Sequence, residues 1–130
     1  MRFLMLMIPN VSDAEWGPTP EMIAAMTRYN RELSEAGVLL SLEGLHPATD
    51  GARVSFAGGT PSVTDGPFAE TNEVIGGYWM IQLGSREEAI DWARRCPAAE
   101  GDVIEIRQVQ EMAEFPPEVQ AAAAEALGQP

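Results

Sequence analysis

Three segments of this chain are apolar on both faces of the strands that they are expected to form. Residues 3–8, 38–42 and 78–83 carry runs of apolar side chains instead of alternating apolar and polar ones. Such runs are typical of strands that are buried on both sides. A sheet built from these segments therefore needs a cover over each face.

Helical patterns separate these strands. Thr19 is a suitable N-cap for the first helix, Gly37 a suitable terminating glycine, and Ser85 with Glu88 has the spacing of a capping box for the second. The order strand, helix, strand, hairpin, strand, helix, strand is the split βαβ pattern of an α+β, ferredoxin-like domain. The expected strands are residues 2–8, 38–45, 78–83 and 103–109, and the expected helices are residues 20–36 and 86–96.

An inserted hairpin and a C-terminal extension complete the chain. Residues 52–56 and 61–64 are expected to pair around a glycine turn, at a sheet edge because Pro61 cannot donate a backbone hydrogen bond. Residues 118–128 favour a helix that docks weakly on its own domain or on a partner subunit, or else a frayed tail. We therefore divide the chain into a domain over residues 1–112 and a helical extension over residues 113–130.

The two expected helices are too few to cover both faces of the sheet. In a split βαβ domain both crossovers place their helices on one face. The other face would then pack on a second sheet, and a two-fold homodimer supplies one. We expect a homodimer in which paired subunits form a dimeric α/β barrel.

Composition excludes several classes of function. The net charge is −12, from 20 acidic residues against 8 arginines, so nucleic-acid binding is not expected. No run reaches the roughly 20 apolar residues of a membrane helix, and the lone Cys96 fits a cytoplasmic protein. One histidine and one cysteine cannot build a zinc site in one subunit, and no nucleotide-binding loop is present. We expect no cofactor and no metal.

The loop of residues 64–71 is the most specific local pattern, since Asp65 and Glu70 bracket a Gly-Pro corner and Phe68. Asp65 is a candidate general acid or base if a cleft desolvates it, because burial raises a carboxyl pKa. Its alternative role is an Asx-turn that accepts backbone N–H groups. Glu70 is a candidate carboxylate partner of Asp65, or a surface or capping residue.

Other polar side chains are candidates for the same cleft. His46 is a candidate proton carrier at neutral pH, or an ordinary solvated loop residue. Arg53 is a candidate clamp for a carboxylate ligand, or a hairpin arginine paired with a nearby acid. The remaining candidates for ligand contacts are Glu43 at the end of a strand and three aromatic residues whose alternative role is core packing: Tyr29, Tyr78, and Phe68 as a lid over the cavity.

These motifs carry a resemblance to a known family. The chain resembles the YCII-related family, and within it the subgroup named for the Asp-Gly-Pro-Phe motif. The resemblance implies a dimeric α/β barrel of ferredoxin-like subunits, with a helix histidine and the loop aspartate facing a cleft in the wider family. Asp65 matches that aspartate, but the first helix holds no histidine. The matching segments are residues 36–38, 43–45 with Pro47, 64–71, 76–78 and 88–89.

Two functions are consistent with these residues. One is a cofactor-free enzyme that acts on a small organic molecule, with proton transfer by Asp65 and assistance from His46, Tyr29 or Tyr78. The other is a non-catalytic dimeric module that binds a metabolite or a protein, for example in transcription. The first fails if the Asp65 carboxyl is exposed on a convex surface or is fully bonded to backbone amides, whereas a cleft with apolar walls that contains Asp65 would favour it.

Overall fold

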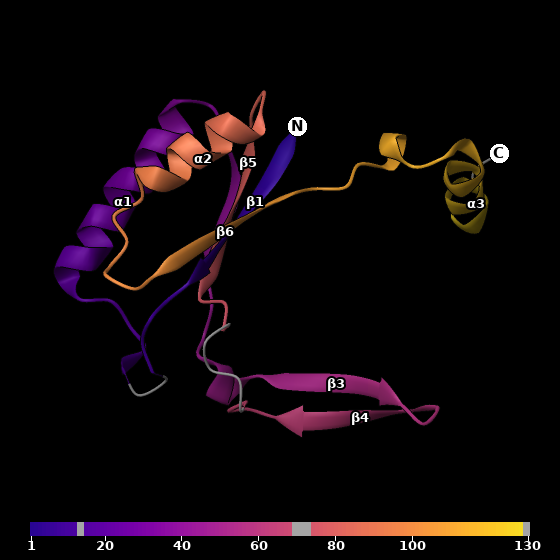
Figure 1. Ribbon diagram of the computed structural model, residues 1–130, viewed down its shortest axis with the longest axis horizontal. Coiled ribbons are helices and arrows are strands. Elements are labelled where there is room, and N and C mark those ends of the chain that lie inside the picture. The colour runs from indigo at the N-terminus through magenta and orange to yellow at the C-terminus, as the bar shows by residue number, and fades with distance from the viewer. Residues whose placement is uncertain (13–14, 69–73, 129–130) are drawn as a thin grey trace.

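A computed structural model describes residues 1–12, 15–68 and 74–128 as a mixed α+β structure with antiparallel sheets. The main sheet has four strands in the order β2-β5-β1-β6, which is compatible with a ferredoxin-like fold. Figure 1 shows its two helices, α1 and α2, on the same side of this sheet. The elements of this layer are β1 (Arg2–Ile8), α1 (Pro20–Glu35), β2 (Leu39–Gly44), β5 (Gly77–Gln82), α2 (Arg86–Arg94) and β6 (Val103–Gln108).

The hydrophobic core lies between the sheet and the two helices. Alternate residues of the central strands point into it, so Phe3 and Met5 of β1 and Ile81 of β5 are fully buried there. Leu33 of α1 and Ala89 of α2 close the core from the helix side.

The helix ends follow the local sequence. The Thr19 hydroxyl accepts a hydrogen bond from Met22 N at 3.2 Å, and the Ser85 hydroxyl accepts one from Glu88 N at 3.2 Å. Gly37 ends α1 with a φ of 75°, a value that favours glycine. The predicted capping box differs in one bond, because the Glu88 carboxylate accepts from Gly84 N rather than from Ser85 N.

The opposite face of the sheet has no helix over it among the described residues. Its centre is apolar, since Leu4, Leu6 and Ile8 of β1 alternate with the core residues of that strand and are only partly buried. Tyr78 and Met80 of β5 lie beside them. The edge strands β2 and β6 are mostly polar on this face, where they carry Ser41, Glu43, Glu105 and Arg107, with Val103 opposite Ile8 at one end. We call this surface the open face.

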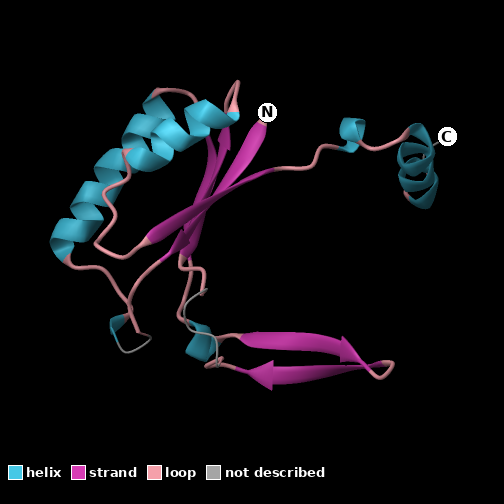
Figure 2. Cartoon of the chain, viewed as in Figure 1, coloured by secondary structure: helices cyan, strands magenta, loops and turns pink. Residues whose placement is uncertain are grey.

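The hairpin is not at the edge of the main sheet, so that prediction was wrong. Strands β3 (Ala52–Ala57) and β4 (Thr60–Asp65) form a separate two-stranded sheet. Figure 2 shows this sheet projecting away from the main one. Pro61 cannot donate a backbone hydrogen bond, and within the described residues no further strand lies beside β4 to need one.

The C-terminal segment leaves the domain at the first residues of β1. Val109 N donates to Arg2 O at 2.9 Å, and the Arg2 guanidinium binds both carboxylate oxygens of Glu111 at 2.6 and 3.0 Å. Helix α3 (Pro117–Ala126) follows and lies away from the main sheet (Figure 1). It is bonded to its own linker through Gln120, whose side chain donates to Phe115 O at 2.8 Å.

Candidate functional site

The main candidate site is an apolar pocket of about 590 Å³ at one end of the sheet, which we call the α1 pocket. Its walls come from the end of β1, the first turns of α1, the end of β2 and the segment between α2 and β6. Residues far apart in the sequence therefore meet there. It is lined by Met7, Pro9, Trp16, Gly17, Pro18, Met22, Ile23, Met26, Gly44, Leu45, His46, Gly76, Pro97, Ala98, Ala99 and Asp102.

Trp16 and three methionines give the α1 pocket its character. The Trp16 indole N–H donates to Leu45 O at 3.0 Å, which holds the ring across the gap between the loop before α1 and the end of β2. Met7, Met22 and Met26 line the walls, and flexible, polarizable methionines adapt to ligands of different shape. The pocket is thus suited to an apolar molecule whose orientation is set by few polar groups.

Asp102 is one of the two ionisable residues that line the pocket, and backbone groups already bind it. Its carboxylate accepts hydrogen bonds from Asn10 N at 2.8 Å and from Ala99 N at 2.9 Å. It thereby ties the exit of β1 to the loop before β6. The carboxylate leaves a negative charge beside the pocket, which disfavours an anionic ligand.

His46 is the other ionisable residue that lines the α1 pocket. Its Nδ1 lies 3.1 Å from Asp50 Oδ2, on the short 3₁₀ turn η2 (Ala48–Asp50). A carboxylate only accepts, so this contact is a hydrogen bond when Nδ1 carries a proton, and Nε2 is then available as a base. The His46 side chain is 89% exposed, so it lies at the mouth of the pocket rather than deep within it.

Asp65 ends β4, is exposed, and does not line the α1 pocket. The next residue, Gly66, packs against the η2 turn so closely that a Cβ added there would overlap Ala48 O. Gly66 N also donates to Gly51 O at 2.9 Å. The Asp-Gly-Pro corner therefore positions the turn that carries Asp50, while the acid/base role of Asp65 itself stays a prediction.

Four other predicted residues lie outside the α1 pocket in two pairs. The Arg53 guanidinium carbon lies 4.0 Å from the centre of the Phe68 ring, a cation–π contact at the base of the hairpin. Glu43 lies opposite Tyr78 in the β2–β5 ladder, on the open face. The structure thus brings each pair together, but neither pair meets His46.

Tyr29 lies in the core, where it is 3% exposed. Its hydroxyl donates to Trp92 O at 2.6 Å, and its ring packs edge-on against Trp79. Burial raises the pKa of Tyr29 well above its ordinary value, with a further increase from Cys96. Tyr29 therefore joins α1 to α2, and its predicted part in ligand contact stays a prediction.

Cys96 is half-buried after α2, and Glu70 lies outside the described residues. Desolvation raises the pKa of the Cys96 thiol to about 11, and the nearby charge of Asp102 adds to this effect. A thiol with this pKa is largely protonated and weakly nucleophilic at neutral pH.

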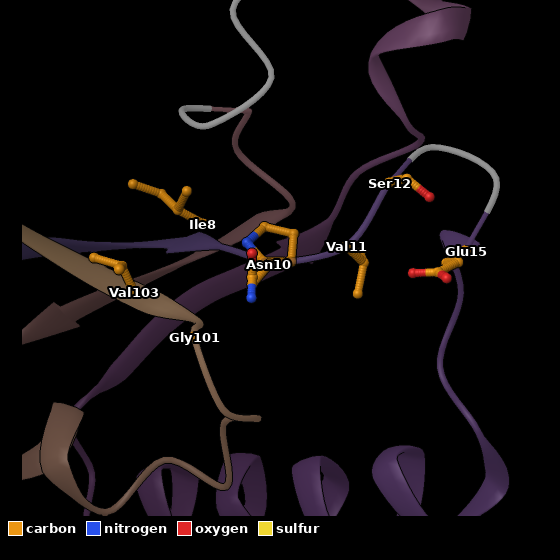
Figure 3. A pocket seen from close by; sticks show the side chains of 8 residues that line it. Ile8, Asn10, Val11, Ser12, Glu15, Gly101 and Val103 are labelled. Atoms are coloured by element: carbon orange, nitrogen blue, oxygen red, sulfur yellow. The ribbon is translucent and has the colours of Figure 1, made fainter.

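A second cavity of about 410 Å³ lies beside the first, beyond Pro9. Figure 3 shows Ile8, Asn10, Gly101 and Val103 toward one end of it and Val11, Ser12 and Glu15 toward the other. It has fewer apolar walls than the α1 pocket and borders the segment whose residues 13–14 are not described, so we build no site on it.

Neither a cluster of metal ligands nor a membrane-spanning helix is found in residues 1–12, 15–68 and 74–128. In this part of the chain no three His, Cys, Asp or Glu side chains gather in a way that could hold a metal ion. None of the helices described there has the length and apolarity that crossing a membrane requires. The expected lack of a cofactor stays a prediction.

Most of the α1 pocket cannot be seen in the sequence pattern. Helical spacing predicts Met22 and Met26 on the core stripe of the first helix, yet Met22 is 48% exposed and Ile23 beside it is 53% exposed. Trp16 lies in a segment for which the sequence pattern predicts a loop and no ligand site. A tryptophan in a loop before an apolar first helical turn is a signal that could have indicated the pocket.

Comparison with known proteins places the chain in a family. Residues 1–113 match the model of the YCII-related domain, whereas α3 lies beyond the matched residues. The chain is also similar to an uncharacterised protein of Rhizobium meliloti (strain 1021), with 39% identity over 69 residues. That match covers 53% of this chain and 56% of the relative, so the chain spans just over half of that protein's length.

Proposed function

We propose that this chain, which belongs to the YCII-related family, is a homodimer that binds a small, mostly apolar organic molecule in the α1 pocket. Within the family we assign it to the subgroup with the Asp-Gly-Pro-Phe motif, on Asp65 to Phe68. The α1 pocket is the single observation that carries the proposal, because it is larger and more apolar than the second cavity described above.

The surroundings of the pocket define the class of ligand. Asp102 lines it, and the chain has a net charge of −12, so the local field opposes anions. Trp16 and the three methionines favour a molecule with a flat or flexible apolar part. The ligand class is therefore neutral or cationic, with an apolar body and few hydrogen-bonding groups.

A neutral fluorescent probe tests the pocket directly. N-phenyl-1-naphthylamine is expected to bind with increased fluorescence, and Met22→Glu is expected to weaken that binding about tenfold by placing a charge in the apolar wall. Ala24→Glu is the control, because Ala24 is exposed on the same helix and does not line the pocket. Equal binding by both variants would place the probe elsewhere and overturn the proposal.

The open face supports the homodimer and its barrel. Its apolar centre on β1 and β5 and its polar rim on β2 and β6 have the composition of a protein interface. A second copy related by a two-fold axis would place centre on centre and close the two sheets into a barrel. Leu6→Asp, at the centre, is expected to give monomers in sedimentation equilibrium.

A change of charge at the rim tests whether the effect of Leu6→Asp on the dimer comes from its place at the apolar centre and not from the change in charge alone. Glu105 lies opposite Leu6 in the β1–β6 ladder and is exposed, so Glu105→Gln changes the dimer affinity little. A wild-type chain that stays monomeric at all concentrations would contradict the dimer and leave the pocket to its own test.

Proton transfer by His46 is a second candidate function. The observation that favours it is the contact of His46 with Asp50 at the mouth of the α1 pocket, which orients the imidazole. Once a substrate of the stated class is found, His46→Gln is expected to abolish turnover and to keep substrate affinity within about threefold. Turnover that survives this change would leave binding as the function.

Asp65 is tested separately as an acid/base residue. Asp65→Asn keeps the size of the side chain and removes its charge. If Asp65 transfers a proton, turnover is lost while the thermal midpoint is unchanged. A lowered midpoint with retained turnover would make Asp65 a structural part of the corner.

A further inference from the structure

The β3–β4 hairpin has one apolar and one polar face. Val54 lies opposite Val63, and Phe56 lies opposite Pro61, so these side chains share a face. The other face carries Arg53, Ser55, Ser62 and Thr64. Every residue of both strands is exposed, and Phe56 is 80% exposed.

Nothing in the described part of the chain covers the apolar face of the hairpin. Its side chains take no part in the hydrophobic core, and its two strands belong to no larger sheet. A two-stranded hairpin is at best marginally stable alone in water. An exposed row of valine and phenylalanine on such a hairpin indicates a contact with another molecule.

The hairpin projects to the side of the open face. In Figure 1 helices α1 and α2 lie on one side of the main sheet, while the hairpin and α3 both extend on the other. At the base of the hairpin, Gly66 contacts the η2 turn that leads into β3. The C-terminal segment is held by the Arg2–Glu111 ion pair. A molecule seated on the open face would therefore lie between two projecting segments.

We propose that the β3–β4 hairpin is an arm whose apolar face packs on a second copy of this chain. The inference rests on the proposed homodimer. It adds to the dimer interface the apolar face of the hairpin and the surface of the second copy that this face covers. By two-fold symmetry each copy gives one arm and receives one. Helix α3 and the residue after it, Leu127, which is 74% exposed, extend the same contact.

The area of the open face supports a second copy as the occupant. The four strands lie about 4.8 Å apart, and the 6 residues of β5 rise about 3.3 Å each, so the flat projected area of this face is roughly 400 Å². Stable interfaces bury about 800 Å² per partner. The hairpin face adds about 200 Å² by the same geometry, so the arms supply much of what the sheets alone lack.

Two neighbouring substitutions in one strand test the arm. Phe56→Asp puts a charge on the apolar face, and Ser55→Asp puts the same charge on the polar face. In sedimentation equilibrium at matched ionic strength, Phe56→Asp is expected to raise the dimer Kd at least about tenfold, and Ser55→Asp less than about threefold. Both residues are exposed in the single chain, so neither change disturbs the core.

Hydrogen exchange gives a second readout on the wild-type protein. The amides of β3 and β4 are expected to gain protection as the concentration is raised through the dimer Kd, because a free hairpin opens readily. A dimer that is lost with Leu6→Asp but unchanged with Phe56→Asp would overturn the arm and keep the sheet-to-sheet dimer. The hairpin would then be open to a different partner. A wild-type monomer at all concentrations would overturn both.

Discussion

Replacing Tyr29 by phenylalanine separates a structural tyrosine from one that serves a ligand. The change removes the hydroxyl that donates to Trp92 O at 2.6 Å and leaves the ring in place. Trp92 O keeps one donor, since Arg95 N lies 3.1 Å from it. Because the carbonyl is not left without a partner, the loss is that of one hydrogen bond, about 1 kcal/mol, and not that of a buried orphan group.

Urea unfolding at one fixed protein concentration measures this loss. Thermal unfolding is a second measure of the same loss. For a chain of this length, a change of about 1 kcal/mol in the free energy of unfolding corresponds to roughly 3–5 °C in the thermal midpoint. The control is Tyr78→Phe on the open face, which removes the hydroxyl of the chain's other tyrosine and is expected to stay within about 0.5 kcal/mol. Binding of the fluorescent probe should be the same in both variants.

The pH dependence gives Tyr29 a second signature. Burial raises the folded-state pKa of Tyr29 above the ordinary value of 10.0, so the fold favours the neutral phenol. This contribution is fully present below pH 10 and is lost as the pH rises further, because only the unfolded chain ionises. The wild type should lose up to about 1.4 kcal/mol per pH unit from this residue, a loss absent from Tyr29→Phe.

Two results would refute this reasoning. One is a Tyr29→Phe variant as stable as the Tyr78→Phe control at neutral pH, with the same decline in alkali as the wild type. The other is weaker probe binding in Tyr29→Phe at unchanged stability, which would return Tyr29 to the ligand site.

Other contacts give three more predictions. Gly66→Ala is expected to speed hydrogen exchange throughout the hairpin about tenfold or more, because the added Cβ would overlap Ala48 O. The control is Gly44→Ala, whose Cβ meets nothing within 4 Å and which should change the exchange rates little. The hydrogen bond from Arg2 lowers the pKa of Glu111, so the ion pair that ties the C-terminal segment to β1 is fully present above the ordinary value of 4.5 and is lost as the pH falls. Proteolysis of the C-terminal segment should therefore become faster at low pH, and Glu111→Gln should remove this pH dependence. Cys96, with its pKa raised from 9.0 to about 11, should react with iodoacetamide at neutral pH about a hundredfold more slowly than the same thiol in urea.

Sequence alone determined the order and type of the elements of the main layer. Hydrophobic runs, the Thr19 and Ser85 caps and the Gly37 terminator are local signals, since each acts on residues within a few positions. Helix α1 spans Pro20–Glu35, where residues 20–36 were expected, and both helices lie on one face of the sheet (Figure 1). The apolar centre of the open face follows from the apolar runs of residues 3–8 and 78–83, which lie in β1 and β5.

Only the tertiary structure decided what those elements bring together. The α1 pocket joins the Met7, Met22, Leu45 and Asp102 regions across four separate segments, and no local period encodes such a meeting. Tyr29 looks from sequence like any polar aromatic on an apolar stripe, and its role depends on a carbonyl 63 residues away. The hairpin alternates as a strand at a sheet edge would, yet β3 and β4 form a separate two-stranded sheet, with Gly66 packed against the η2 turn at its base. Secondary structure depends on neighbours in sequence, whereas a site depends on the packing of distant segments, and for this reason the sequence predicted the layer and missed the pocket.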